Sequence, residues 1–135
     1  MTYPSGRSVS YTLNGRGNAT TAGTYASSVT YAPHGGLTGL TLGNGVQETV
    51  AWDARLRWQS LGASKGTPSL SITNTYAANG NVKTQQATIG NGTATYTQTF
   101  DYDNVNRLVS ASETNLGAGV AWSQTYGLTD TETAR

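Results

Sequence analysis

The chain has no cysteine, few charged residues and no long hydrophobic run, and each absence excludes a class of protein. Without cysteine, its 135 residues offer neither disulfides nor thiolate metal sites. Only 11% of the residues are charged, the net charge is +1, and lysines and arginines are scattered singly, which argues against nucleic acid or an anionic membrane as the main partner. No stretch approaches the roughly 18 apolar residues of a membrane span. Residues 1–7 lack the apolar run of a signal peptide.

The abundant residues are threonine, serine, asparagine, glycine and tyrosine, a composition typical of β-strands joined by many turns. Apolar and polar side chains alternate with a period of two, most clearly in residues 8–13 and 46–53. The dipeptide Asn14-Gly15 favours a tight hairpin turn, because both residues accept positive φ. Since no helical period is sustained, the sequence predicts an all-β protein.

One unit of aromatic, Asp and Arg recurs along the chain, and its best copies lie in residues 50–58 and 99–110. The aromatic anchors follow one another at intervals of 20, 21, 24, 26 and 24 residues, and they are Tyr11, Tyr31, Trp52, Tyr76, Tyr102 and Tyr126. Two strands of about six residues and two turns fill such a period. We therefore predict that residues 1–135 form a single array of about six consecutive antiparallel β-hairpins, paired edge to edge. The anchors would stack as a ladder on one face, and a fully buried Tyr102 would make Tyr102→Ala cost roughly 3–5 kcal/mol.

These residues resemble the YD-repeat, or RHS-repeat, family, whose unit reads roughly Tyr-Asp-x-x-Gly-Arg-Leu. Two copies match on aromatic, Asp and Arg, and three others keep less of the unit. The matching residues are Tyr102, Asp103, Arg107 and Leu108 in one copy, Trp52, Asp53, Arg57 and Trp58 in another, Tyr11, Gly15 and Arg16 in a third, Tyr76 and Gly80 in a fourth, and Tyr31, Gly35 and Leu37 in a fifth. The resemblance implies a strongly twisted, coiling sheet that forms part of a shell or tube, outside the cell or on its surface. In bacterial toxins such a shell encloses a toxic region, and in teneurins a similar shell belongs to an adhesion protein.

The polar repeat residues are interpreted as structural. Asp53 and Asp103 occupy the same turn position in two repeats, so capping of a turn is favoured over a catalytic role. For the repeated arginines, which are Arg16, Arg57 and Arg107, pairing with nearby Asp or carbonyl groups is favoured over anion binding. Gly15 and Gly80 are interpreted as turn residues, and His34 as a solvent-facing turn residue. We expect no catalytic residue, no metal site and no cofactor, and hence no enzyme.

The leading hypothesis is a structural repeat protein in the wall of an extracellular or cell-surface shell. The chain would be a segment of a longer repeat array, or a subunit completed by copies of itself. Its partners would be flanking repeats or other copies joined through strand edges, with an encapsulated toxin or a surface glycan as further candidates. Two alternatives stay open, a self-assembling extracellular filament and a carbohydrate- or protein-binding adhesion module. The adhesion module would use Trp52, Trp58 and Trp122, together with the tyrosine anchors, as a sugar-stacking platform.

Overall fold

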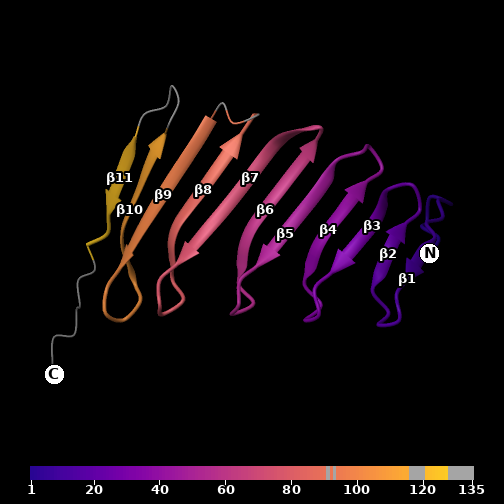
Figure 1. Cartoon of the computed structure of the whole chain (residues 1–135), viewed down its shortest axis with the longest axis horizontal. Coiled ribbons are helices and arrows are strands. Elements are labelled where there is room, and N and C mark those ends of the chain that lie inside the picture. Colours follow the sequence, from indigo (N-terminus) through magenta and orange to yellow (C-terminus); the bar gives the residue numbers. More distant parts are fainter. Residues whose placement is uncertain (91, 93, 116–120, 128–135) are drawn as a thin grey trace.

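The computed structural model describes residues 1–90, 92, 94–115 and 121–127, which form one antiparallel sheet of eleven strands (Figure 1). The strands are β1 (Tyr11–Leu13), β2 (Ala19–Ala22), β3 (Ala26–Tyr31), β4 (Leu37–Leu42), β5 (Gln47–Trp52), β6 (Trp58–Lys65), β7 (Thr67–Tyr76), β8 (Val82–Ile89), β9 (Ala94–Tyr102), β10 (Leu108–Asn115) and β11 (Trp122–Thr125). Their order in the sheet is their order in the chain. The predicted all-β fold of consecutive hairpins is thereby confirmed. In the described part of the chain there is no helix long and apolar enough to cross a membrane.

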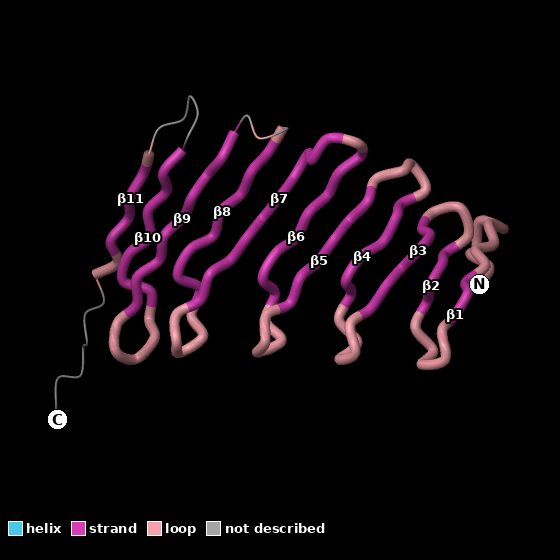
Figure 2. Tube along the Cα trace, viewed as in Figure 1, coloured by secondary structure: helices cyan, strands magenta, loops and turns pink. Residues whose placement is uncertain are grey.

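Five turns of the same geometry lie along one edge of the sheet, the lower edge in Figure 2, here called the turn edge. They are residues 14–18, 32–36, 53–57, 77–81 and 103–107. In each turn the N–H of the first residue donates to the carbonyl of the fifth at 2.8–2.9 Å, and the N–H of the fourth donates to the carbonyl of the first at 2.9–3.1 Å. The fourth residue has a positive φ, and these residues are Gly17, Gly35, Leu56, Gly80 and Asn106. Such a loop is a type I turn followed by a left-handed residue.

The first of these turns differs from the expectation. Neither Asn14 nor Gly15 has a positive φ, and Gly17 takes the left-handed conformation with a φ of 80°. The reason is the Asn14 side chain, whose Oδ1 accepts the N–H groups of Arg16 and Asn18 at 2.9 and 3.0 Å. This side-chain cap requires a loop long enough for both N–H donors to reach the Oδ1 atom, and a two-residue turn is too short for this.

The two faces of the sheet differ in chemistry. Directly opposite partners in antiparallel strands project to the same face, and neighbours along one strand project to opposite faces. One row across β5 to β9 is apolar and consists of Val50, Leu61, Ile72, Ala87 and Tyr96. The adjacent row on the other face consists of Thr49, Gly62, Ser71, Thr88 and Thr95. The first row therefore carries aliphatic and aromatic groups and the second carries mainly hydroxyl groups. The face of the first row also bears a polar row on β7 to β9, which consists of Asn74, Gln85 and Gln98.

No second layer covers either face in the described part of the chain. Among the described residues only Val9, Ala111 and Asn74 are buried. Each strand contacts only the strands next to it in sequence, and the sheet remains open between β1 and β11 (Figure 1). Stability therefore depends on strand pairing, cross-strand side-chain pairs and contacts between neighbouring hairpins. Tyr102 is only half-buried. The predicted loss of roughly 3–5 kcal/mol for Tyr102→Ala required a fully buried ring, and the structure does not fulfil this condition.

Candidate functional site

Three of the repeat aromatics make the same hydrogen bond to the preceding hairpin. The acceptor is in each case the backbone carbonyl of the residue that directly follows the preceding turn. The donors are Tyr31 Oη, Trp52 Nε1 and Tyr76 Oη, and the acceptors are the carbonyls of Ala19, Leu37 and Trp58, respectively. The first two bonds measure 2.8 Å. The aromatic side chain thus ties its own hairpin to the start of the returning strand of the hairpin before.

In the part of the chain that the structure describes, the other three anchors do not make this bond, and two of them, Tyr11 and Tyr126, are also placed differently. Leu13 rather than Tyr11 precedes the first turn, so Tyr11 lies two residues earlier in its hairpin than the anchors that end β3, β5, β7 and β9. Tyr126 follows β11, and its backbone N–H donates to the carbonyl of Val109 at 2.9 Å. Within the described residues, neither of these tyrosines nor Tyr102 makes the aromatic-to-carbonyl bond. The ladder is therefore complete only in the middle of the sheet.

The tryptophans do not gather into one platform. Trp52 and Trp58 are cross-strand partners on β5 and β6. Trp122 lies on β11, where it pairs with Glu113 of β10, and its side chain is exposed. The structure therefore brings two of the three tryptophans of the hypothetical sugar platform together and leaves the third several strands away.

Asp53 and Asp103 cap their turns in the same way as Asn14. Oδ1 of Asp53 accepts the N–H groups of Arg55 and Arg57 at 2.8 and 2.9 Å. Oδ1 of Asp103 accepts the N–H groups of the third and fifth residues of its turn at 2.9 and 2.8 Å. The second oxygen of each Asp pairs at 2.7 Å with the arginine that ends the turn. Both oxygens of these carboxylates are engaged inside the turn.

These bonds lower the pKa of both carboxyl groups. For Asp53 the main causes are the backbone and side-chain hydrogen bonds of Arg57, and for Asp103 the side-chain and backbone hydrogen bonds of Arg107. A carboxyl group whose folded pKa lies below its ordinary value of 3.8 contributes stability above that value, and this contribution is lost as the pH falls through the folded pKa.

Asp103→Asn is expected to lower the thermal unfolding temperature at pH 7 but to have little effect at about pH 2. The amide oxygen keeps the two backbone acceptor bonds, as Asn14 shows, and only the charge pairing with Arg107 is lost. Thermal unfolding followed by circular dichroism across this pH range measures the difference. A difference between variant and wild type that stays constant down to about pH 2 would contradict the ion-pair role.

Side chains at the third position of the turns reach forward to the next turn. Arg16 Nη1 donates to the carbonyl of Pro33 at 2.7 Å, and Arg55 Nη1 donates to the carbonyl of Ala78 at 2.8 Å. The remaining two neighbouring pairs of turns are joined by other chemistry. The His34 ring meets the Trp52 ring edge-on at 5.1 Å, and Asn79 Nδ2 donates to Asn106 Oδ1 at 2.7 Å. Side chains therefore connect all four neighbouring pairs of these hairpins at the turn edge, three of them from turn to turn and one from His34 to Trp52 at the end of β5.

The three repeated arginines do not share one role. Arg16 is the third residue of its turn and bonds to the next turn, whereas Arg57 and Arg107 are fifth residues and pair with the Asp of their own turn. Arg57 also lies over the ring of Tyr76, with 4.1 Å between the guanidinium carbon and the ring centre. It therefore links the third and fourth hairpins by a cation–π contact.

Leu56→Gly is expected to stabilise the protein by about 1 kcal/mol. Leu56 has a φ of 60° and an exposed side chain, and the left-handed conformation costs a non-glycine residue about 1–2 kcal/mol. Urea unfolding measures the change. Ala54→Gly, in the same turn but without a positive φ, is the matched control and should instead lose about 0.5–1 kcal/mol. Equal effects of the two substitutions would contradict this explanation.

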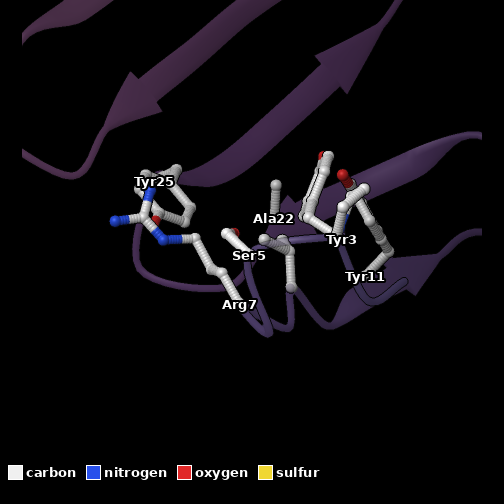
Figure 3. A pocket seen from close by; sticks show the side chains of 8 residues that line it. Tyr3, Ser5, Arg7, Tyr11, Ala22 and Tyr25 are labelled. Atoms are coloured by element: carbon white, nitrogen blue, oxygen red, sulfur yellow. The ribbon is translucent and has the colours of Figure 1, made fainter.

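A pocket lies at the N-terminal end of the sheet (Figure 3). Residues 1–9 form a small hairpin in which the N–H of Tyr3 donates to the carbonyl of Arg7 at 2.8 Å. Between this hairpin and the first strands is a volume of about 600 Å³. The lining residues are Tyr3, Pro4, Ser5, Arg7, Val9, Tyr11, Ala22 and Tyr25.

The pocket combines three tyrosine rings with one cation. The Arg7 guanidinium carbon lies 5.7 Å from the centre of the Tyr25 ring. A hydrogen bond to Tyr3 raises the pKa of the Tyr11 hydroxyl further above its ordinary value of 10.0, so this group is protonated at neutral pH as tyrosine hydroxyls ordinarily are. Sequence reasoning missed this site, because no motif shows that the hairpin of residues 1–9 lies against Tyr11 and Tyr25. In the part of the chain that the structure describes, no cluster of His, Asp and Glu is suited to hold a metal ion.

Comparison with known proteins shows a likeness of fold. No protein-family model matches the chain, and no curated protein sequence matches it. Among solved structures, it is similar to a chain of a mutant Tc holotoxin pore from Photorhabdus luminescens, with a TM-score of 0.53 and 11% sequence identity. The likeness shows the fold alone. It covers 87% of this chain but only 8% of that chain, so the present chain spans a small part of the length of the protein it resembles.

Proposed function

We propose that this chain is a structural module, a stretch of the wall of a hollow β-shell or tube of the RHS type, with no catalysis of its own. The observation that carries the proposal is the single layer. Eleven strands follow one another without a covering layer in the described residues, and each hairpin is bound only to its neighbours. A repeat array of this kind extends by adding hairpins, and its stability is the sum of neighbouring interfaces.

The different chemistry of the two faces supports a wall. The row from Val50 to Tyr96 is apolar, and the rows on the opposite face carry hydroxyl groups. A shell has one face toward its interior and one toward water, and we assign the face that carries the apolar row to the interior. The fold likeness to a Tc holotoxin pore supports the same proposal. The proposal includes a location outside the cell or at its surface and an association with a toxin.

The partners in this proposal are further repeats or other copies, joined through strand edges. Within the described chain, β1 and β11 each pair on one side only. All residues of both strands are exposed. An unpaired edge strand is a template for another strand. The same observation favours the second candidate function, a filament that grows edge to edge.

Negative-stain electron microscopy of the purified 135-residue chain, with light scattering for mass, tests the proposal. Regular shells, tubes or filaments are expected, and a stable 14.1 kDa monomer would contradict it.

Leu13→Lys, on the outer strand β1, is expected to reduce assembly, because a charge on an edge strand opposes pairing. Leu56→Lys is the matched control, since Leu56 is equally exposed, at 57% against 58%, but lies in an interior turn. Equal assembly of the two variants would argue against growth at this edge.

A further inference from the structure

The N-terminal pocket contains a single charged group. Arg7 is the only charged residue among those that line it, and no Asp or Glu is present there. The ion pairs found in the described residues involve Arg57 and Arg107, not Arg7. Its contact is with the face of the Tyr25 ring. Stacking on a ring does not use the five N–H donors in the plane of a guanidinium, so these donors remain available to an anion.

The rest of the pocket offers flat apolar surfaces. Three tyrosines contribute their rings, and as residues Tyr3, Tyr11 and Tyr25 are 40%, 45% and 49% exposed, whereas Val9 beside them is buried. In Figure 3 the rings of Tyr3 and Tyr11 lie at one side of the pocket and Arg7 with Tyr25 at the other. With the Tyr11 hydroxyl protonated, no negative charge from it opposes an anionic ligand at neutral pH.

We propose that this pocket binds a carboxylate carried on a flat apolar body. The carboxylate pairs with the Arg7 guanidinium, whose planar fork matches two carboxylate oxygens. The flat body stacks on the tyrosine rings at the other side, where offset and edge-on arrangements are favourable. A volume of about 600 Å³ is in the range of small-ligand sites. This inference goes beyond the structural role and does not depend on it.

Calorimetric titration with phenylacetate tests the proposal. Phenylacetate combines a ring with a carboxylate, phenylacetamide keeps the ring without the charge, and acetate keeps the charge without the ring. We expect saturable binding of phenylacetate with a Kd on the order of 1 mM or tighter, and at least about tenfold weaker binding of the other two. Equal affinity for phenylacetate and phenylacetamide, or no saturable binding of phenylacetate, would overturn the proposal.

Substitutions locate the binding. Arg7→Gln is expected to weaken phenylacetate binding about tenfold or more, whereas Lys65→Gln, which removes a cation far from the pocket, should leave it unchanged. Circular dichroism checks that the sheet is intact. Tyr25→Leu is a second variant, which keeps the Arg7 charge but removes the ring beneath it. We expect it to weaken phenylacetate binding several-fold. If both pocket variants bind as wild type does, the ligand is not held in this pocket and the proposal fails.

Two natural sources present this chemistry, a small aryl carboxylate and the free C-terminus of a peptide that ends in an aromatic residue. A short peptide ending in phenylalanine, compared with its C-terminal amide, distinguishes them. Tighter binding of the free peptide than of phenylacetate assigns the pocket to a peptide C-terminus. Tighter binding of phenylacetate assigns it to a small molecule. Either result, with loss in Arg7→Gln, supports the carboxylate site.

Discussion

Gly43→Ala is expected to destabilise the sheet by about 3 kcal/mol, one of the two largest effects of a single substitution that we expect. Gly43 lies at the sheet edge opposite the turn edge, where its N–H donates to the carbonyl of Tyr25 at 2.7 Å. A β-carbon at this position would overlap the carbonyl oxygen of Thr24 and lie 3.0 Å from the carbonyl carbon of Thr24 and 3.3 Å from the Cα of Tyr25. Because all three atoms belong to the backbone, the segment that precedes β3 and the segment that follows β4 must move apart.

Gly15→Ala is the matched control. Gly15 also lies in a hairpin turn, but it has no positive φ and no atom lies within 4 Å of a β-carbon built there. Replacing such a glycine by alanine stabilises a protein by up to about 1 kcal/mol, because alanine reduces the conformational entropy of the unfolded chain. Urea unfolding of both variants measures the difference. If Gly43→Ala stays within about 0.5 kcal/mol of wild type, the close approach of the two backbones is not present in solution.

Trp52→Ala is expected to cost about 3 kcal/mol, at the low end for loss of a tryptophan because the ring is half-buried. The ring lies over Gly36, so that a β-carbon on Gly36 would be 2.8 Å from two of its atoms. It also meets His34 edge-on and donates its N–H to Leu37. Trp52→Phe keeps most of the ring and loses the donor, so about 1 kcal/mol is expected. Urea unfolding gives both values.

A double-mutant cycle tests whether the ring position is the cause. Gly36→Ala alone should destabilise, because the new methyl group displaces the Trp52 ring. In the Trp52→Ala background the same substitution should cost less, since only the His34 ring, whose Nε2 the new methyl group would also meet, then has to move. Two residues in contact give coupling energies of about 0.5–3 kcal/mol. Strictly additive losses would contradict direct packing of Trp52 on Gly36.

The sequence predicts the hairpin array because period and chemistry agree. The aromatic, the Asp and the Arg of the recurring unit each have a physical role that a sequence motif can show. The aromatic binds the preceding hairpin, as Trp52 does, the Asp caps the turn, as Asp53 does, and the Arg pairs with that Asp, as Arg57 does. The fourth position of the turn takes a positive φ, which explains why glycine suits it.

The residues that sequence reasoning misplaced are those where local rules conflict. Around the first turn the sequence offers both Gly15 and Gly17, and only the side-chain cap of Asn14 decides that Gly17 is left-handed. Leu56 and Asn106 adopt positive φ without being glycine, so composition does not reveal them. Tyr11 was aligned with the other anchors by residue type, although Leu13 precedes the turn.

The contacts between turns were also beyond prediction. Arg16 reaches Pro33 and Arg55 reaches Ala78 across neighbouring hairpins. Such pairs form only where two neighbouring turns lie at matching positions along the turn edge. The unequal spacing of the repeats does not allow these positions to be predicted from the sequence. The pocket of the N-terminal hairpin depends in the same way on a contact between segments with no shared pattern.

Hydrogen exchange of individual strands tests most directly the central claim, that this protein is a continuous single-layer array in which each hairpin is held by its neighbours. We expect strong protection from β5 to β9, weaker protection at β1 and β11, and rapid exchange in the turns. In Gly43→Ala, protection should be lost around β3 and β4 and retained in β7 to β9, because energetic coupling in a repeat array passes only between neighbours. Loss of protection in all strands together would show one cooperative globular unit and would contradict the account.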